Sequence, residues 1–377
     1  MTTYYIDPDL AVDGDGSAAT PFNTYAGHAF TANNSYLQKA GTTFTAPSGT
    51  SIILGGDNIT LGKYGSGADP VYNQNGEAYA IVVNAGDGCV VEDFTIVSSG
   101  TDTACIAVST AATNATVRRC SVSVGNSIGI YVTGAGVTGV TISDNDITIN
   151  AGGKVGIHFV TGAGGVVSGN TIRNLAADKT SAFQTGIRLE SWTGAIVKEN
   201  IIGTSSTDSF SMGIRSDGNS NVITENAVTG CYANGIWLVG VTGNIVSGNT
   251  IRDVWDGTVY PAASASLGGI YLNKGSANTS NIICRNTVID CYRGISDLTS
   301  AAGGGNKIYG NIIYHALLNG IDCQTGSGTQ TLIANNTVVH SPTPAFNAGH
   351  GIVQQLGGAA TDVRIVNNVV TCDVLAS

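Results

Sequence analysis

The sequence predicts an all-β protein that folds as a parallel β-solenoid of about 11 to 12 coils. The composition favours strands and turns, because the 377 residues include 52 glycines and only 11% are charged. Two short phrases alternate along the chain, and both place apolar residues at every second position, which is the period of a strand. Since one copy is too small to bury an apolar face, successive copies must stack, about 4.8 Å apart.

The first phrase has the approximate form V-I-x-x-N-x-I and contains a repeated asparagine. Asparagine tolerates the left-handed αL conformation, so we expect this residue in a turn of each coil, with its amide bonded to the next coil's asparagine. The repeated residues are Asn145, Asn170, Asn200, Asn226, Asn249, Asn286, Asn311, Asn336 and Asn368. A second ladder is expected from Asn221, Asn244, Asn281 and Asn306.

The second phrase, G-I-x-x-x, predicts a strand on another side of each coil. Its isoleucines should form one inward column, and the aliphatic residues three positions before the repeated asparagines should form another. The first column is Ile130, Ile157, Ile187, Ile214, Ile236, Ile270, Ile295, Ile321 and Ile352. The second column is Ile142, Val167, Val197, Ile223, Val246, Ile283, Ile308, Ile333 and Ile365.

The repeat resembles the right-handed parallel β-helix superfamily of pectin-lyase-like proteins, over roughly residues 51–377. "DGDGSAATPFNTYAGHAF" and "AGTTF" are similar to the segment that caps such helices, and "ITLGKYGSGADPV" is similar to their first coil. The resemblance implies an N-terminal cap segment over residues 1–50 and a right-handed parallel β-helix over 51–377. Proteins of this type are mostly polysaccharide lyases, glycoside hydrolases, epimerases and phage tailspikes, so it is specific for fold and only suggestive for activity.

Composition argues against several classes of function. A formal charge of −10 without a long basic run disfavours nucleic-acid binding, and the lack of an 18-residue apolar run argues against membrane insertion. The eight cysteines are scattered without a CxxC pair, so we expect buried thiols. No cofactor and no metal site are expected, and "DGDG" at 13–16 fits a capping turn. The first ten residues lack the pattern of a secretory signal.

Length variation is concentrated at one edge of the predicted solenoid. The stretch from each G-I phrase to its asparagine is about 13 to 17 residues, whereas the stretch from the asparagine to the next G-I phrase is about 8 to 20. Binding loops of solenoids occupy such an edge. The longest insertion is residues 252–268, which contain Trp255, and the others are "RNLAADKTSAFQT" and "HSPTPAFNAGH".

The residue after each G-I isoleucine should face outward beside these loops. Candidate substrate-binding residues in this outward column are Tyr131, His158, Arg188, Arg215, Trp237 and Tyr271, and Asn273 and Trp255 complete the set. Aromatic rings that alternate with arginines and carboxylates suit an extended sugar chain. The alternative is a surface ladder in which Arg188 pairs with Glu190 and Arg215 with Asp217.

Three carboxylates are the candidate catalytic residues: Glu190, Asp217 and Asp322. Glu190 and Asp217 are expected on adjacent coils, about 5 Å apart, where one carboxylate raises the pKa of the other. Such a pair suits glycoside hydrolysis. A lyase reaction would instead use Arg188 or Arg215 beside a neutralised uronate. The sequence does not decide between these reactions, and it leaves open whether the protein is an enzyme.

An outward aliphatic stripe on another sheet predicts an oligomer. Four residues before the repeated asparagines stand Val166, Ile196, Val222, Ile245, Ile282 and Leu332. Such a stripe is costly for a monomer, and phage tailspikes are trimers, so the resemblance implies a homotrimer.

Together these features favour a phage virion-associated, tailspike-like protein on the tail or capsid surface. It would bind a bacterial surface polysaccharide, and other virion proteins would be further partners; whether it also depolymerises the glycan stays open. Two alternatives remain: a secreted, extracellular polysaccharide lyase or glycoside hydrolase, and a structural or capsid-decoration solenoid without activity.

Overall fold

The computed structural model describes residues 1–48, 50–98, 103–125, 127–150, 154–175, 184–205, 210–254, 267–273, 276–299, 303–324, 330–340, 350–354 and 363–372. All regular structure in these ranges is β, which confirms the predicted class. Within them no helix has the length and apolar character that a membrane span requires. The chain forms two compact units, Met1–Asp178 (unit 1) and Lys179–Ser377 (unit 2).

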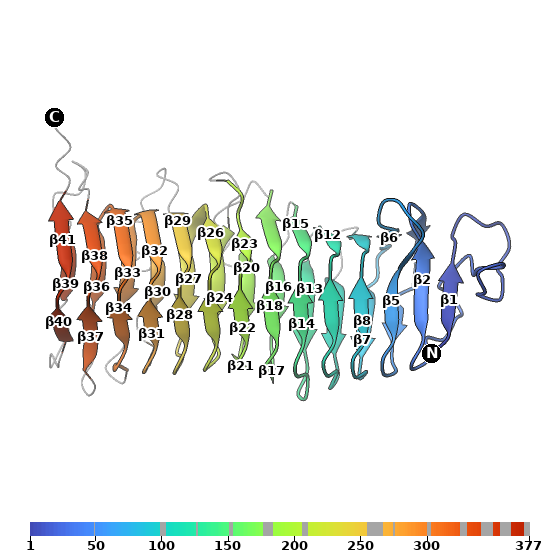
Figure 1. Ribbon diagram of the computed structural model, residues 1–377, viewed down its shortest axis with the longest axis horizontal. Helices are drawn as coiled ribbons and strands as arrows, with labels where there is room; N and C mark the ends of the chain where they lie inside the picture. Colours follow the sequence, from blue (N-terminus) through green and yellow to red (C-terminus); the bar gives the residue numbers. More distant parts are fainter. Residues whose placement is uncertain are drawn as a thin grey trace. The chain divides into compact units, whose positions relative to one another are not determined.

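In unit 1 the strands stack as three parallel sheets, which we name A, B and C (Figure 1). Sheet A contains β1 (Thr3–Ile6), β2 (Ser35–Lys39), β5 (Thr60–Tyr64), β8 (Val90–Glu92), β11 (Thr116–Arg118), β14 (Thr141–Ser143) and β18 (Val166–Ser168). Sheet B contains β3 (Thr43–Thr45), β6 (Val71–Asn73), β9 (Thr95–Val97), β12 (Ser121–Val124), β15 (Asp146–Ile149) and β19 (Thr171–Asn174). Sheet C contains β4 (Ile52–Leu54), β7 (Tyr79–Asn84), β10 (Ala104–Ser109), β13 (Ile128–Thr133) and β16 (Val155–Phe159). A short strand, β17, covers Gly162–Ala163.

Unit 2 is built in the same way, and we keep the sheet names within it. Sheet A contains β22 (Ile196–Lys198), β25 (Val222–Thr224), β28 (Ile245–Ser247), β31 (Ile282–Cys284), β34 (Lys307–Tyr309), β37 (Thr331–Ala334) and β40 (Val363–Val366). Sheet B contains β23 (Ile201–Ile202), β26 (Ala227–Thr229), β29 (Thr250–Val254), β32 (Thr287–Cys291), β35 (Ile312–Ala316), β38 (Thr337–His340) and β41 (Val369–Cys372). Sheet C contains β20 (Thr185–Leu189), β24 (Phe210–Ser216), β27 (Cys231–Leu238), β30 (Gly268–Leu272), β33 (Arg293–Asp297), β36 (Asn319–Cys323) and β39 (His350–Gln354). A short strand, β21, covers Trp192–Thr193.

From β2 onward the strands, apart from the short β17 and β21, enter the three sheets in the repeating order A, B, C, so both units are parallel β-solenoids. The two predicted aliphatic columns lie inside, and their side chains are 0% exposed from Ile130 to Ile321 and from Ile142 to Ile333. In the last coil Ile365 is 44% exposed. The glycine of each G-I phrase lies in the first half of its sheet C strand or near its middle. A Cβ at Gly213 would lie 2.3 Å from Val228 Cγ1 and 2.6 Å from the carbonyl oxygen of Gly235, so only glycine fits.

The predicted asparagine ladder is present at the turn between sheets A and B, where its members are at most 2% exposed from Asn145 to Asn336. Asn226 is representative: its Nδ2 donates to Asn249 Oδ1 at 2.9 Å, and its Oδ1 accepts from Asn200 Nδ2 at 2.9 Å. The expectation that the ladder residue is αL is wrong, because the preceding residue has the positive φ, as in Glu225 (57°). The αL residue turns the chain from sheet A toward sheet B, and the asparagine after it bonds along the stack.

The second ladder is also confirmed, in unit 2. The backbone N–H groups of Asn221, Asn244 and Asn281 donate to the side-chain oxygens of Asn244, Asn281 and Asn306 at 2.8 to 2.9 Å. All four side chains are fully buried.

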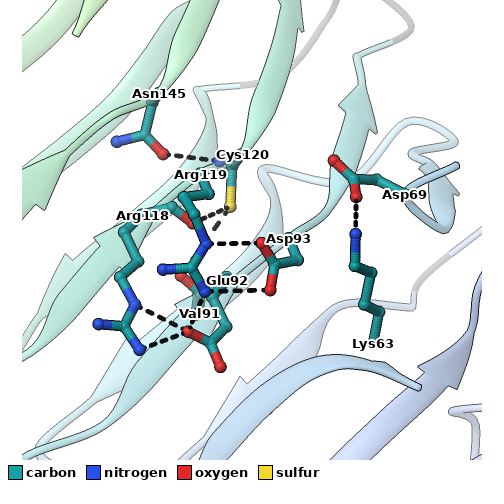
Figure 2. A network of polar contacts seen from close by, with 9 residues as sticks. All are labelled: Lys63, Asp69, Val91, Glu92, Asp93, Arg118, Arg119, Cys120 and Asn145. Carbon is teal, nitrogen blue, oxygen red and sulfur yellow. Dashed lines mark hydrogen bonds and ion pairs between the residues drawn. The ribbon is translucent and has the colours of Figure 1, made fainter. Parts of the chain in front are cut away.

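In unit 1 the ladder position holds Phe94 and Cys120 before the asparagines begin, and Asn145 Oδ1 accepts the Cys120 N–H (Figure 2). Here the αL residues themselves pair, since Arg119 Nε donates to Asp93 Oδ1 at 2.8 Å. The Arg119 guanidinium lowers the pKa of Asp93. An outer ion pair thus joins two coils where no amide ladder does.

Segment 1–50, predicted as a cap, contributes β1, β2 and β3, and β2 and β3 pair in parallel with β5 and β6. In "DGDG", Asp15 accepts hydrogen bonds from Thr20 Oγ1 and from the Ser17 N–H, which lower its pKa to about 2. This pattern fits the expected turn. Seven cysteines are buried thiols, as expected, and the side chain of Cys372 lies outside the described residues.

An ionisable group is buried within unit 2. Asp297, on β33, is in register with the buried Leu272 and is itself 0% exposed. Its carboxyl group accepts hydrogen bonds from Thr299 Oγ1 and, at 2.9 Å, from Asn306 Nδ2. Burial raises the pKa of Asp297, and the two hydrogen bonds offset part of this effect.

We predict that Asp297→Asn stabilises the protein at neutral pH. The unfolded chain releases this proton at a lower pH than the folded chain does. The wild-type Asp297 carboxyl group therefore contributes its full stabilisation below the ordinary aspartate pKa, and this contribution is lost as pH rises through the raised pKa. Asparagine stays neutral, and its amide can still accept from Asn306 and donate to Thr299. Thermal unfolding between about pH 4 and pH 8 should show the wild-type midpoint falling relative to the variant. Parallel curves would contradict the assignment.

Candidate functional site

The outward column of sheet C has the register predicted for it. In unit 2 Arg188 pairs with Arg215, Arg215 with Trp237, and Trp237 with Tyr271, on β20, β24, β27 and β30. The column continues to Ser296 and Asp322 on β33 and β36. Glu190 and Asp217 directly follow β20 and β24, so each carboxylate stands two residues after an arginine.

Four charged side chains of two successive coils form one cluster. Arg188 Nη2 lies 2.8 Å from Glu190 Oε2, and Arg188 Nε lies 3.8 Å from Asp217 Oδ2. Arg215 Nε donates to both carboxylate oxygens of Asp217, at 3.0 and 2.9 Å. The two ion pairs of the ladder alternative are therefore present. Arg188 also links the acids of two coils, which a set of independent surface pairs would not do.

Trp237 extends this cluster on the next coil. The Arg215 guanidinium carbon lies 4.6 Å from the centroid of the Trp237 ring, within the range of a cation–π contact. The rings of Trp237 and Tyr271 are 6.3 Å apart at an interplanar angle of 35°. The Trp237 side chain is half-buried, and among the described residues its Nε1 has no hydrogen-bond partner. Asp217 and Trp237 together hold the Arg215 side chain in place.

The pKa of Asp217 is raised above its ordinary value. Burial raises this pKa, while the hydrogen bonds from Arg215 and the charge of Arg188 lower it in part. The Asp217 side chain is 15% exposed, compared with 38% for the Glu190 side chain. The two acids therefore occupy different environments, which is the arrangement that separates an acid from a base.

Two candidates at the C-terminal end of the column are not accessible. Tyr271 and Asp322 are both 0% exposed, contrary to the expectation that they contribute to an open surface. Asp322 lies 3.4 Å from Arg293 Nη1 and accepts a hydrogen bond from Asn319 Nδ2 at 3.2 Å. A buried carboxylate requires such partners. The accessible part of the column is therefore shorter than the sequence indicated.

Sequence reasoning overlooked Arg293 and Asn319. Each precedes the glycine of a G-I phrase, in "RGIS" and "NGID", and each is at most 9% exposed. The residue before that glycine is a third side-chain position beside the column. The position before the glycine could have been found from the sequence if the aligned G-I phrases had begun one residue earlier.

Of the four remaining candidates, the structure describes Tyr131, His158 and Asn273. Tyr131 and His158 belong to unit 1, where they are in register with ring centroids 5.6 Å apart, and His158 is 8% exposed. Asn273 Nδ2 donates to Ser276 Oγ at 3.1 Å in a local turn. Trp255 lies outside the described residues, as does most of the insertion that contains it.

The strand bounds agree with the predicted position of the length variation. The insertions fall between a strand of sheet B and the next strand of sheet C, as between β29, which ends at Val254, and β30, which begins at Gly268. Each insertion is therefore joined to the beginning of a sheet C strand, next to the outward column.

Comparison with solved structures identifies proteins of the same fold. A lacto-N-biosidase from Eubacterium ramulus is 11% identical over 97% of this chain and 68% of its own, with a TM-score of 0.54. The Dettilon tailspike protein is 17% identical over 88% of this chain and 62% of its own, with a TM-score of 0.55. The mannuronan C-5 epimerase A-module from Azotobacter vinelandii is 12% identical over 89% and 90%, with a TM-score of 0.50.

These identities establish the fold alone, which the chain shares with a lacto-N-biosidase, an epimerase module and a tailspike protein. No curated protein matches the chain significantly. The family model described as "Right handed beta helix region" matches residues 71–210 and 180–370. Three stacked parallel sheets, the asparagine ladders and this match agree, and the chain belongs to the right-handed β-helix family.

Proposed function

We propose that this protein binds a bacterial surface polysaccharide on the outer face of sheet C in unit 2, as a tailspike-like component of a phage virion. The observation that carries the proposal is the Trp237 ring held against Arg215, beside the carboxylates Glu190 and Asp217. An aromatic ring presents an apolar surface to the face of a sugar ring, and convergent charged groups fix its hydroxyls.

Two further observations support a saccharide ligand. The protein has a formal charge of −10, which disfavours nucleic acid as the partner. Its fold is shared with a lacto-N-biosidase, an epimerase and a tailspike. A secreted lyase or hydrolase would use the same surface, and a purely structural solenoid would not need an aromatic residue there.

Cleavage of the bound glycan is a second candidate function, favoured by the raised pKa of Asp217. A carboxyl group that keeps its proton to higher pH can protonate a leaving oxygen. Glu190, linked to Asp217 through Arg188, would then act as base or nucleophile. Activity would decline as pH rises through the Asp217 pKa, because the acid form would be lost.

Incubation with capsular and lipopolysaccharide preparations tests both functions. New reducing ends would indicate a hydrolase, and the ultraviolet absorbance of unsaturated uronates would indicate a lyase. We expect Glu190→Gln combined with Asp217→Asn to abolish the formation of new reducing ends and, because the amides still hydrogen-bond to sugar hydroxyls, to leave glycan binding within about threefold of wild type. Undiminished product formation by the double variant would remove these acids from the mechanism. Lack of binding to every glycan in the panel would count against the proposed function itself.

A homotrimer completes the proposal. On sheet A of unit 2 the outward positions Ile196, Val222, Ile245 and Ile282 are in register, and Ile196 is 39% exposed. Lys307 interrupts the stripe before Leu332. An apolar stripe of this kind is expected to be covered by another copy. Light scattering should give three times the mass of one chain, and a monomer at micromolar concentration would contradict the assignment.

A further inference from the structure

The first strand of sheet C in unit 1, β4, has a partner strand on one side only. Sheet A has β1 before β2, whereas sheet C begins with β4, which pairs only with β7, just as sheet B begins with β3, which pairs only with β6. In a parallel sheet alternate backbone groups of a strand point to opposite sides. Among the described residues, no hydrogen bond joins the backbone of Ile52–Leu54 to the segment beneath it.

A groove runs along this open edge. It has a volume of about 680 Å³, and segment 25–30 forms one wall. The other wall consists of Thr50, Ser51, Ile53 and Gly55, which come from β4 and its flanks. Such a volume is within the range of about 300–1,000 Å³ that is usual for binding sites. The groove and the unused backbone groups therefore coincide.

The wall opposite β4 is fixed by packing. The Tyr25 hydroxyl donates to Gln38 Oε1 at 2.7 Å, and the Tyr25 ring meets Phe44 edge-on at 5.0 Å. The His28 ring stacks on Phe22 at 3.8 Å, and its Nε2 lies 3.0 Å from Asp13 Oδ2. A rigid wall keeps the groove open, so a ligand would not have to order it.

The chemistry of the groove suits an extended polypeptide. Ile53 is 53% exposed on β4, and β4 contains no charged residue and no proline, the usual protections of an edge strand. Glu77 precedes β7 and lines the end of the groove near Ser51, whose hydroxyl donates to the carbonyl oxygen of Tyr79. Glu77 forms no ion pair with any described residue. A partner strand would therefore match an apolar side chain to Ile53 and a basic one to Glu77.

We propose that this groove binds an extended strand of a partner protein, which extends sheet C by one strand beneath β4. Main-chain hydrogen bonds to β4 would supply affinity, and Ile53 and Glu77 would supply specificity. This interaction is independent of the glycan site, which lies in unit 2.

The probe is a fluorescein-labelled peptide with the sequence of residues 79–84, the strand that already pairs with β4, preceded by two lysines. Fluorescence anisotropy with the full chain should show saturable binding. Ile53→Lys should weaken it at least tenfold, because a charge at the strand edge opposes pairing. Ala29→Arg, on the opposite wall, should have the same effect if Ile53→Lys fails to fold. Ile201→Lys is the matched control, since Ile201 is exposed to 45% on sheet B of unit 2.

Glu77→Gln should weaken binding of the lysine peptide. It should not change the affinity for a peptide in which serines replace the two lysines. Trp237→Ala should change neither, which separates this proposal from the glycan site. Equal binding of a scrambled peptide, full binding by both groove variants, or displacement of the peptide by an oligosaccharide would overturn the proposal.

Discussion

Asn226→Ala should destabilise the protein by about 3 to 5 kcal/mol, the largest loss that we expect from one substitution. Asn226 is 1% exposed. Its Nδ2 donates to the carbonyl oxygens of Val197 and Thr224 and to Asn249 Oδ1, and its Oδ1 accepts from the N–H and the Nδ2 of Asn200. Alanine would remove the acceptor of the Asn200 N–H and one hydrogen bond from each of the other groups, although Asn249 Oδ1 keeps the backbone N–H of residue 226 and Asn200 Nδ2 keeps the Lys198 carbonyl oxygen. Each buried group left unsatisfied costs about 1–3 kcal/mol.

Asn219→Ala is the matched control for the ladder variant. Asn219 Oδ1 accepts a hydrogen bond from the Thr242 N–H at 2.7 Å, but the side chain is exposed, so water can replace it. Guanidinium unfolding of both variants measures the difference. A loss for Asn226→Ala no larger than that for Asn219→Ala would show that the ladder adds nothing beyond a surface hydrogen bond.

The stacking rule could be predicted because it repeats. Every coil imposes the same demands, so Ile214 and Ile236 occupy the same position, and one misread copy does not alter the pattern. The conformation of the turn was harder to predict. The αL position holds Asp144, Gly169, Glu199 and Arg285 in different coils, and so offers no residue type to recognise. The ladder asparagine that follows it is constant, and the αL conformation was therefore predicted for the asparagine instead.

The site could be predicted in register but not in accessibility. Alternation places Trp237, Tyr271 and Asp322 on the same face of sheet C, and the structure does so. Whether a residue on that face reaches solvent depends on what packs over it, and the strand pattern carries no information about this. Tyr271 and Asp322 are therefore buried although their position in the strand is outward.

Trp237→Ala should weaken glycan binding by about 2 kcal/mol, or roughly 30-fold. Alanine would remove the ring that contacts both Arg215 and Tyr271, and would leave the guanidinium with Asp217 alone. Trp237→Phe should retain most of the affinity, since a smaller ring still offers an apolar face. The carboxylates would keep their arginine partners in both variants, so the loss would report on the ring.

Calorimetric titration with the glycan that binds wild-type protein measures this effect, and thermal unfolding verifies that the variants are folded. Tyr314→Ala is the matched control, because Tyr314 is an aromatic residue exposed to 40% on sheet B of the same unit. If both alanine variants bind as wild type does, the glycan occupies another surface. If both lose affinity equally, contact with exposed rings is nonspecific. A loss confined to Trp237→Ala would place the sugar on sheet C, where the aromatic ring and the paired charges meet.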